Sequence, residues 1–299
     1  MTDTLQLNCC STLVDQFGRV HTSLRISVTD RCNIRCFYCM PAEGVVFRPR
    51  DEILSFEEIE QFVAAVSQAG VSKLRITGGE PLVRQDVWRL VERLIAMDNI
   101  EEVALTTNGI LLSEQAEQLK QSGLHRLNIS LDTLSEKTFQ QITRRTGLSR
   151  VLAGIQAAQD AGFTRIRINA LAIRDLTEDD IVPLGQFARR HDLHLRFIEF
   201  MPLDADGEWK SEQVLSGNDV RQCLEAALGP LVPSPRNDPS QPAVDYEFSD
   251  GAGQVGFINP VTQPFCGDCN RLRLTAEGHV RNCLFSTADW DVRPLLRRG

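Results

Sequence analysis

Six closely spaced cysteines are the residues of this sequence with the clearest capacity for chemistry. They form two triplets, spaced C-x3-C-x2-C and C-x2-C-x13-C, which are Cys32, Cys36 and Cys39, and Cys266, Cys269 and Cys283. Three thiolates can hold three corners of a [4Fe–4S] cluster, which normally takes four cysteine ligands. A missing fourth protein ligand leaves one iron open to a small molecule, which indicates reaction chemistry rather than electron storage.

Zinc binding is the alternative interpretation of both triplets. Structural zinc usually takes four protein ligands, and no His or Cys near the first triplet supplies an obvious fourth. The aromatic Tyr38 inside the last C-x2-C also differs from a zinc knuckle. In the second triplet, His279 would complete a C-x9-H-x3-C pattern with acceptable spacing, so zinc and a second cluster both stay open there.

Two arginines lie just after Cys269, inside the second triplet. Arg271 and Arg273 alternate along an expected strand, so their side chains lie on one face, beside the proposed metal site. A surface pair is the simpler interpretation, but in a chain of net charge −8 we expect this pair to bind an anion.

Short β-type runs alternate with helical patterns, and these must position the cysteines. Candidate strands span 24–28, 73–77, 103–107, 126–131, 164–173 and 195–200, and candidate helices span 55–69, 113–122 and 149–161 and begin again at 177. The clearest helix starts at the capping box of Ser55 and Glu58 and stops at Gly70. Ser113 is expected to cap the second helix, and Thr177 to start the fourth.

Six strands separated by helices predict parallel βαβ units of the α/β class. Six units are too few for a closed eight-fold barrel, so we expect a partial (βα)6 TIM-like barrel, with functional groups at the carboxyl ends of its strands. The alternation ends near residue 205, and the proline-rich stretch 229–242 indicates an irregular connector before β-like runs at 254–258 and 271–275. We therefore predict a core over 1–205 and a small C-terminal domain over 206–299.

The composition limits where the protein acts and what it binds. With 32 basic and 40 acidic residues the chain is a poor general nucleic-acid binder. Nine cysteines is an odd number, and Cys9, Cys10 and Cys223 match no motif, so they are expected to be ordinary thiols. No apolar run is long enough for a transmembrane helix, and no secretory signal is evident. These features predict a cytoplasmic protein that binds neither nucleic acid nor membrane.

The first triplet, with an aromatic residue before its last cysteine, resembles the signature of the radical S-adenosylmethionine (SAM) superfamily. The stretch Gly78-Gly79-Glu80-Pro81 after the second strand is similar to that family's motif for the SAM amino group, with the Glu80 carboxylate offered to an ammonium. The resemblance implies that the open iron binds SAM, and that one electron from the cluster cleaves it to a radical that abstracts a hydrogen atom.

A narrower resemblance covers the chain from about Leu24 to its end. Leu24-Arg25-Ile26-Ser27 and the run from Phe265 to Thr275, together with the distant Cys283, resemble the GTP 3′,8-cyclase family. This implies a lyase that converts GTP to 3′,8-cyclo-7,8-dihydro-GTP, the first step of molybdenum cofactor biosynthesis. It further implies two [4Fe–4S] clusters, SAM, an electron donor, and a downstream cyclic pyranopterin monophosphate synthase that uses the product. Whether the protein forms a homodimer is a question that the sequence leaves open.

The resemblance also assigns residues to the ligands. The SAM cluster takes the first triplet and the GTP cluster takes the second. SAM contacts fall on Tyr38, Gly79, Ser130 and Met201. GTP contacts fall on Arg25, Arg75, Thr106, Arg167, Arg271, Leu272 and Arg273, with Lys73 and Arg196 nearby. The family usually carries lysine where this chain has Arg167, which keeps the charge and changes the geometry.

The family pattern continues for roughly another 30 residues beyond Gly299 and ends in Gly-Gly, and the resemblance implies that this tail reaches the active site. From the 299-residue chain we accordingly expect ligand binding with little cyclised product. Two other functions stay open. One is a radical SAM enzyme that modifies peptides with an auxiliary cluster, and the other is a non-catalytic zinc or iron–sulfur binding protein.

Overall fold

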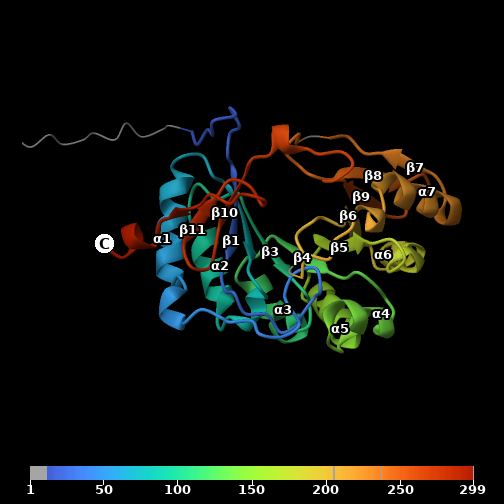
Figure 1. Ribbon diagram of the computed structural model, residues 1–299, viewed down its shortest axis with the longest axis horizontal. Helices are drawn as coiled ribbons and strands as arrows, with labels where there is room; N and C mark the ends of the chain where they lie inside the picture. The colour runs from blue at the N-terminus through green and yellow to red at the C-terminus, as the bar shows by residue number, and fades with distance from the viewer. Residues whose placement is uncertain (1–11, 205, 237, 299) are drawn as a thin grey trace, which may run out of the picture.

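Six parallel strands in chain order form the centre of the fold (Figure 1). The computed structural model describes residues 12–204, 206–236 and 238–298, so Cys9 and Cys10 lie outside the described residues. The central strands are β1 (Ser23–Ser27), β2 (Lys73–Thr77), β3 (Glu102–Thr107), β4 (Arg126–Ser130), β5 (Ile166–Ala172) and β6 (His194–Glu199). Each matches a predicted strand to within two residues at either end.

Helices follow the strands and cover the outer face of the curved sheet (Figure 1). They are α1 (Phe56–Ser67), α2 (Val87–Ile95), α3 (Leu112–Gln121), α4 (Glu136–Thr143), α5 (Leu148–Asp160), α6 (Ile181–Arg190) and α7 (Gly217–Leu228). A short helix, α8 (Arg293–Leu296), lies near the C-terminus. No helix among the described residues is long and apolar enough to cross a membrane.

The C-terminal strands extend the central sheet at both edges. They are β7 (Leu231–Pro233), β8 (Val244–Phe248), β9 (Gln254–Ile258), β10 (Arg271–Leu274), β11 (His279–Arg281) and β12 (Trp290–Asp291). β9 pairs in parallel with β6, whereas β10 pairs in parallel with β1 at the other edge. The order β12-β11-β10-β1-β2-β3-β4-β5-β6-β9-β8-β7 confirms an open, partial barrel. The division into units 1–205 and 206–299 stays a prediction, because these strands share one sheet.

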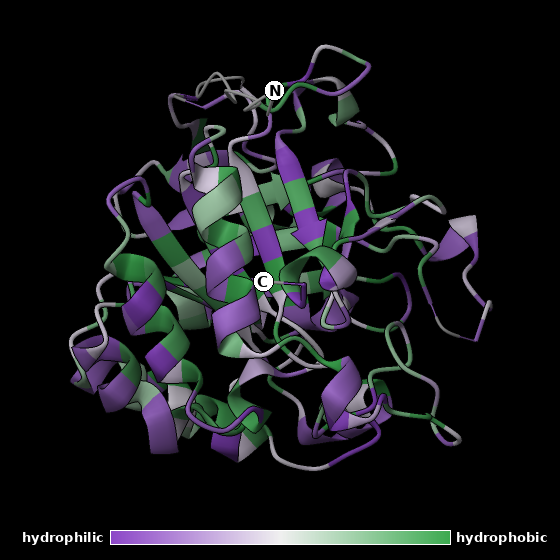
Figure 2. Cartoon of the chain, turned by 90° about the vertical axis from the view of Figure 1, so that its left-hand side faces the viewer, coloured by the Kyte–Doolittle hydropathy of each residue, from purple (hydrophilic) through white to green (hydrophobic). Residues whose placement is uncertain are grey.

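Alternation along the strands separates the hydrophobic core from the barrel interior. In β1, Leu24 and Ile26 are fully buried toward the helices, and Arg25 lies on the opposite face. Figure 2 shows the alternation as green and purple bands along several strands. The polar face of each strand therefore lines the concave side of the sheet, where a ligand can bind.

Local signals predicted some helix starts correctly and others wrongly. The capping box of α1 is present, because Glu58 N–H donates to the Ser55 hydroxyl and Ser55 N–H donates to the Glu58 carboxylate. The prediction that Ser113 caps α3 is wrong, because the helix already starts at Leu112 with no side-chain cap. A backbone hydrogen bond from Leu112 N–H to the Gly109 carbonyl starts this helix one turn earlier.

Two further expectations need correction. Thr177 precedes only a 3₁₀ turn, Glu178–Asp180, and α6 begins after it. The Thr177 hydroxyl instead donates to the Leu171 carbonyl and accepts from Ile173 N–H, so it braces the end of β5. The connector 229–242 is not wholly irregular, because β7 lies within it and pairs with β8.

Candidate active site

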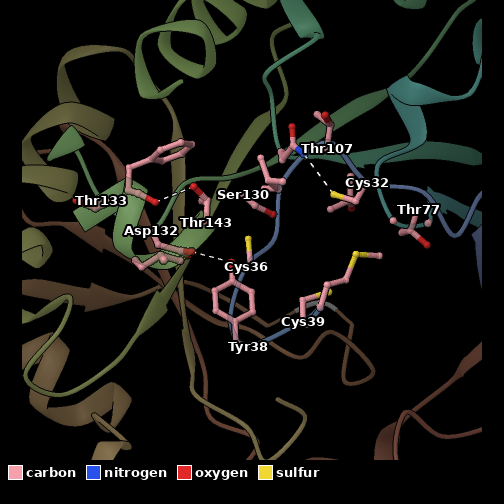
Figure 3. A pocket seen from close by; sticks show the side chains of 18 residues that line it. Cys32, Cys36, Tyr38, Cys39, Thr77, Thr107, Ser130, Asp132, Thr133 and Thr143 are labelled. Carbon is pink, nitrogen blue, oxygen red and sulfur yellow. Dashed lines mark hydrogen bonds between the residues drawn. The ribbon is translucent and has the colours of Figure 1, made fainter. Parts of the chain in front are cut away.

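The first cysteine triplet lies in the loop after β1, at the carboxyl ends of the parallel strands. All three thiols line one cavity of about 150 Å³, and Figure 3 shows their sulfur atoms facing this common space. The loop is held on α4, since Arg35 N–H donates to the Thr143 carbonyl and Phe37 N–H donates to the Ile142 carbonyl. The structure therefore brings together the three thiols that the sequence singled out.

The glycines after β2 allow this loop to approach the neighbouring turn. A Cβ atom at Gly79 would lie only 2.3 Å from the Arg31 carbonyl oxygen, so no other residue fits without moving the loop. Gly79 N–H donates to the Thr29 carbonyl at 2.7 Å. Gly79 also lines the cavity, as the SAM assignment requires.

Glu80 does not offer its carboxylate to the cavity, which corrects the expectation from sequence. It is 1% exposed and accepts hydrogen bonds from Leu82 N–H, Asn108 N–H and the Thr107 hydroxyl at 2.7–3.0 Å. Burial raises the pKa of Glu80 to about 7. Its role is to brace β2 against β3, and the Asn108 amide in turn donates to Asn33 within the triplet loop.

Sequence reasoning missed the part that Asp132 plays. The Tyr38 hydroxyl donates to one Asp132 oxygen, and Leu171 N–H donates to the other, each at 2.8 Å. Burial raises the pKa of Asp132 to about 6. Figure 3 shows the Tyr38–Asp132 bond beside the cysteines, where it fixes the aromatic ring at the wall of the cavity. The only sequence signal was its place directly after the fourth strand.

The chemistry of the first site fits an iron–sulfur cluster. Burial raises the pKa of Cys32, Cys36 and Cys39, so these thiols are protonated in the absence of a metal and must lose their protons to bind one. Among the described residues, no three His, Cys, Asp or Glu side chains gather tightly enough for a single metal ion. Three thiols spread around one cavity suit the corners of a larger cluster.

A row of arginines lines the barrel interior beside the first site. The strand register places Arg273 beside Arg25 and Arg25 beside Arg75. Arg25 and Arg75 line a cavity of about 520 Å³ that also includes Thr106, whose buried hydroxyl has no partner among the described residues. The row therefore places cations and an unused hydroxyl donor in one space.

These arginines carry positive charge without compensation. Burial lowers the pKa of Arg25 well below its usual value and lowers the pKa of Arg75 to about 9. The charges of neighbouring arginines lower both pKa values further. Arg126, two strands along the same row, differs because Glu102 pairs with it at 2.7 Å. Half-buried cations that meet no carboxylate among residues 12–204, 206–236 and 238–298 favour binding of an anion.

Arg167, which was assigned to the nucleotide, and the two basic residues expected nearby, Lys73 and Arg196, have other surroundings. Arg167 lines a separate cavity of about 400 Å³ at the amino ends of β5, β6 and β9, not the cavity of the arginine row. Lys73 pairs with Asp238 at 3.4 Å, and Arg196 pairs with Asp245 at 3.0 Å. Nevertheless, Arg167 and Arg196 contribute to the positive potential that lowers the pKa of Arg75.

The second triplet faces another cavity, of about 320 Å³. Cys266, Cys269 and Cys283 line it with Arg271 and Arg273. Arg271 donates two hydrogen bonds to the Cys269 sulfur at 3.2 and 3.3 Å. Burial raises the pKa of Cys269, but the backbone hydrogen bond from Arg271, its charge and its side-chain bonds outweigh burial and lower this pKa overall. A lowered pKa favours the thiolate form that binds a metal.

His279 does not join this triplet. Its Nδ1 atom lies 2.9 Å from Asp289, and His279 is absent from the described residues that line the cavity. The four-ligand zinc pattern considered from sequence therefore has no geometric support. Three thiols with an adjoining space fit a cluster with one open iron.

Three of the residues assigned to ligand contacts have surroundings that the sequence did not predict. Leu272 is a core residue, 9% exposed, because its neighbours Arg271 and Arg273 occupy the opposite face of β10. Met201 lines the arginine cavity and the second-triplet cavity, but it does not line the cavity of the first triplet. Arg271 is engaged with Cys269, whereas the Arg273 Nε atom is buried without a partner among the described residues.

The three cavities adjoin one another across the barrel mouth. Tyr38, Cys39 and Ser130 line both the first-triplet cavity and the arginine cavity. Arg25 and Met201 line both the arginine cavity and the second-triplet cavity. The resulting tract leads from one set of thiols past uncompensated arginines to the other, so one anionic ligand can reach both sites.

Comparison with known proteins agrees with this arrangement. Residues 26–188 match the radical SAM superfamily, and residues 193–299 match the family described as Molybdenum Cofactor Synthesis C. Among solved structures, Streptococcus suis SuiB is similar with a TM-score of 0.67 and 16% identity, covering 94% of this chain and 66% of SuiB. The structure of anSMEcpe with bound AdoMet is similar with a TM-score of 0.62 and 17% identity, covering 89% of this chain and 75% of that one. These likenesses show the fold.

The partial barrel and its cysteine loop define a member of the radical SAM superfamily. A "GTP 3′,8-cyclase" of Rhodopirellula baltica is 53% identical over 96% of this chain and 81% of that protein. Another, of Pelotomaculum thermopropionicum, is 45% identical over 95% of this chain and 88% of that protein. The chain therefore belongs to the GTP 3′,8-cyclase family.

Proposed function

We propose that this chain is a radical SAM lyase that converts GTP to 3′,8-cyclo-7,8-dihydro-GTP at the start of molybdenum cofactor biosynthesis. The carrying observation is the half-buried row of Arg25, Arg75 and Arg273, which has no carboxylate partner in the described part of the chain and lies between two cysteine triplets. A nucleoside triphosphate supplies the negative charge that this row needs.

We infer that the first triplet holds one [4Fe–4S] cluster with SAM, and the second triplet holds another. When bound, the first cluster and SAM supply a radical that removes a hydrogen atom, which no side chain can do. The chain's own residues position the reactants. Tyr38, Gly79 and Ser130 line the SAM side of the tract, and the arginines hold the phosphates on the other side.

In this proposal the second triplet orients the base of GTP. Its cavity is lined mainly by apolar side chains such as Phe265, Ile258 and Leu284, which suit a planar purine. The arginine cavity lies directly beside it, so base and triphosphate would occupy adjoining spaces. Holding the ribose between these anchors directs it toward SAM, and such positioning contributes much of the rate in a reaction of this kind.

The test is anaerobic incubation of the reconstituted protein with GTP, SAM and a reductant, followed by mass analysis of the nucleotide and of 5′-deoxyadenosine. From the 299-residue chain we expect 5′-deoxyadenosine with only a little cyclised nucleotide, an isomer of GTP that chromatography separates before mass analysis, and neither product with Cys36→Ala. Arg150→Gln, on an exposed helix, is the matched control for Arg25→Gln and keeps the wild-type yield. Cleavage of SAM in the presence of peptides only, with GTP unchanged, would favour the peptide-modifying alternative.

The remaining assignments belong to the same proposal. We propose that a cellular electron donor reduces the clusters, that a cyclic pyranopterin monophosphate synthase uses the product, and that the enzyme acts in the cytoplasm. The homodimer is tested by the mass of the particle in solution. Metal analysis separates the proposal from a zinc protein, since two clusters require about eight irons per chain.

A further inference from the structure

Two cysteines of the second triplet are carried by a loop that crosses the open side of the barrel. Residues 259–270, here named the strap, connect β9 to β10. β9 pairs with β6 and β10 pairs with β1, so the strap leads from one edge of the six central strands to the other. The strap holds Cys266 and Cys269. Because the strap is not part of the sheet, the positions of these two cysteines depend on other contacts.

Glu199 holds the beginning of the strap. It is the last residue of β6 and is 1% exposed. One carboxylate oxygen accepts from Val261 N–H and Thr262 N–H, each at 2.9 Å, and the other accepts from the Thr262 hydroxyl. Gly217 N–H, at the start of α7, lies 3.4 Å from the same carboxylate. All of these donors are neutral, so this buried charge is stabilised by the strap itself.

Close packing supports the same attachment. A Cβ atom on Gly217 would lie 2.2 Å from the side-chain oxygen of Asn259, the first residue of the strap. Asn259 also closes a turn, because its carbonyl accepts from Gln263 N–H at 3.0 Å. The first five residues of the strap are thus fixed between the end of β6 and the start of α7.

The rest of the strap has weaker attachments. Arg19 donates to the Cys266 carbonyl at 3.0 Å in an exposed contact. At the far end, the Asn270 amide donates to the Thr22 hydroxyl at 2.8 Å, and the Asn270 carbonyl accepts from Ser23 N–H. Arg19 and Arg271 are also charged and contact the strap near its cysteines, but Glu199 is buried and accepts three hydrogen bonds from the strap's first residues, so it is the main anchor of the strap's beginning.

We propose that Glu199 is a positioning residue for the second metal site. By fixing residues 259–263 it sets where the strap starts, and so where Cys266 and Cys269 meet Cys283 at the cavity. The inference rests on the proposed function in so far as the site holds a cluster. It also gives a role to the buried carboxylate at the end of β6, a strand that lines the arginine cavity with Arg196 and Ile198.

The test uses Glu199→Gln, which keeps the shape but places an amide donor against N–H donors. Losing charge-assisted bonds of this kind corresponds to a roughly ten- to hundredfold change in a local opening equilibrium. In the metal-free protein we therefore expect amide hydrogen exchange of the Val261–Thr262 segment to accelerate by about that factor. After anaerobic reconstitution we expect about four irons per chain instead of about eight, with SAM cleavage by the first site retained.

Asp180→Asn is the matched control. Asp180 is also buried, and it accepts from the Thr133 hydroxyl and Leu134 N–H, far along the chain from the strap. This variant should leave strap exchange and iron content as in the wild type. If Glu199→Gln does not fold, Thr262→Val removes a single strap bond and should give a smaller acceleration in the same segment.

Unchanged strap exchange together with full iron content in Glu199→Gln would overturn the proposal, as would an equal effect of Asp180→Asn on the strap. A failure of the proposed function is distinguishable, because wild-type protein would then bind one cluster or form no cyclised nucleotide. The exchange comparison in metal-free protein still decides whether Glu199 holds the strap.

Discussion

Replacing Arg75 with methionine should stabilise the protein while weakening its nucleotide binding. Arg75 is half-buried, its charged neighbours are arginines, and burial followed by their charges lowers its pKa to about 9. Since one pKa unit corresponds to about 1.4 kcal/mol, keeping this guanidinium charged at pH 7 costs on the order of 5 kcal/mol before solvent and relaxation reduce the figure. Replacing unfavourably buried charge with an apolar group typically recovers about 1–4 kcal/mol.

The pH dependence has a definite sign. The pKa of Arg75 is lower in the folded than in the unfolded chain, so the unfolded chain binds this proton more tightly. The free-energy cost of keeping Arg75 charged in the folded protein is therefore fully present at neutral pH. It is relieved only as the pH rises above about 9. At pH 7 we therefore expect the melting temperature of nucleotide-free Arg75→Met to rise by a few degrees. Its affinity for GTP should fall roughly ten- to hundredfold, because charge-assisted bonds to phosphate are lost.

Arg126→Met is the matched comparison, because Arg126 lies on the same row but is paired with Glu102 at 2.7 Å. Burial lowers the pKa of Arg126 less, to about 10, because Glu102 opposes the change. Removing this cation also costs Glu102 its shorter ion pair and leaves Arg165 at 3.4 Å, so Arg126→Met should gain less stability than Arg75→Met. Thermal denaturation of the cluster-loaded protein, with and without GTP, and equilibrium dialysis measure both quantities. A lower melting temperature for Arg75→Met, with unchanged GTP affinity, would refute the idea that the row is kept for an anion.

Three further results follow from the site. Cys36→Ala should abolish one cluster and all SAM cleavage, whereas Cys269→Ala should keep about four irons and SAM cleavage. If iron analysis shows that either folded variant has lost both clusters, the two sites are not separate. Arg273→Ala should weaken GTP binding roughly ten- to hundredfold with SAM affinity unchanged, and equal GTP affinity in a titration would make this arginine structural. Burial raises the pKa of Glu80 from 4.5 to about 7, so this group's share of the unfolding free energy falls by about 3 kcal/mol as the pH rises through that window. Glu80→Gln should reduce the fall in unfolding free energy between pH 5 and pH 8, measured by urea denaturation, and leave the share of Asp132 in place. An unchanged fall in the variant would argue against a buried charge at Glu80.

The sequence by itself was sufficient for the local features of this protein. Period-two alternation and the capping box predicted the six central strands and α1. The spacing of the first triplet predicted a common thiol site, and Arg271 and Arg273 were expected to share a face. These features depend on covalent spacing and side-chain periodicity, which are properties of short segments. The family resemblance added the function, which the comparisons support at up to 53% identity.

Only the tertiary structure decided which partner each polar group meets. Pairing of β10 with β1 brings Arg273 beside Arg25 across almost 250 residues of chain, and no local pattern specifies that pairing. The same pairing makes the strap cross the barrel and depend on Glu199. Arg167 and Arg75 looked equivalent in sequence, yet they line different cavities, because strand register sets the height of a side chain along the barrel. Burial and ionisation arise from non-local packing, so they are decided when the strands assemble.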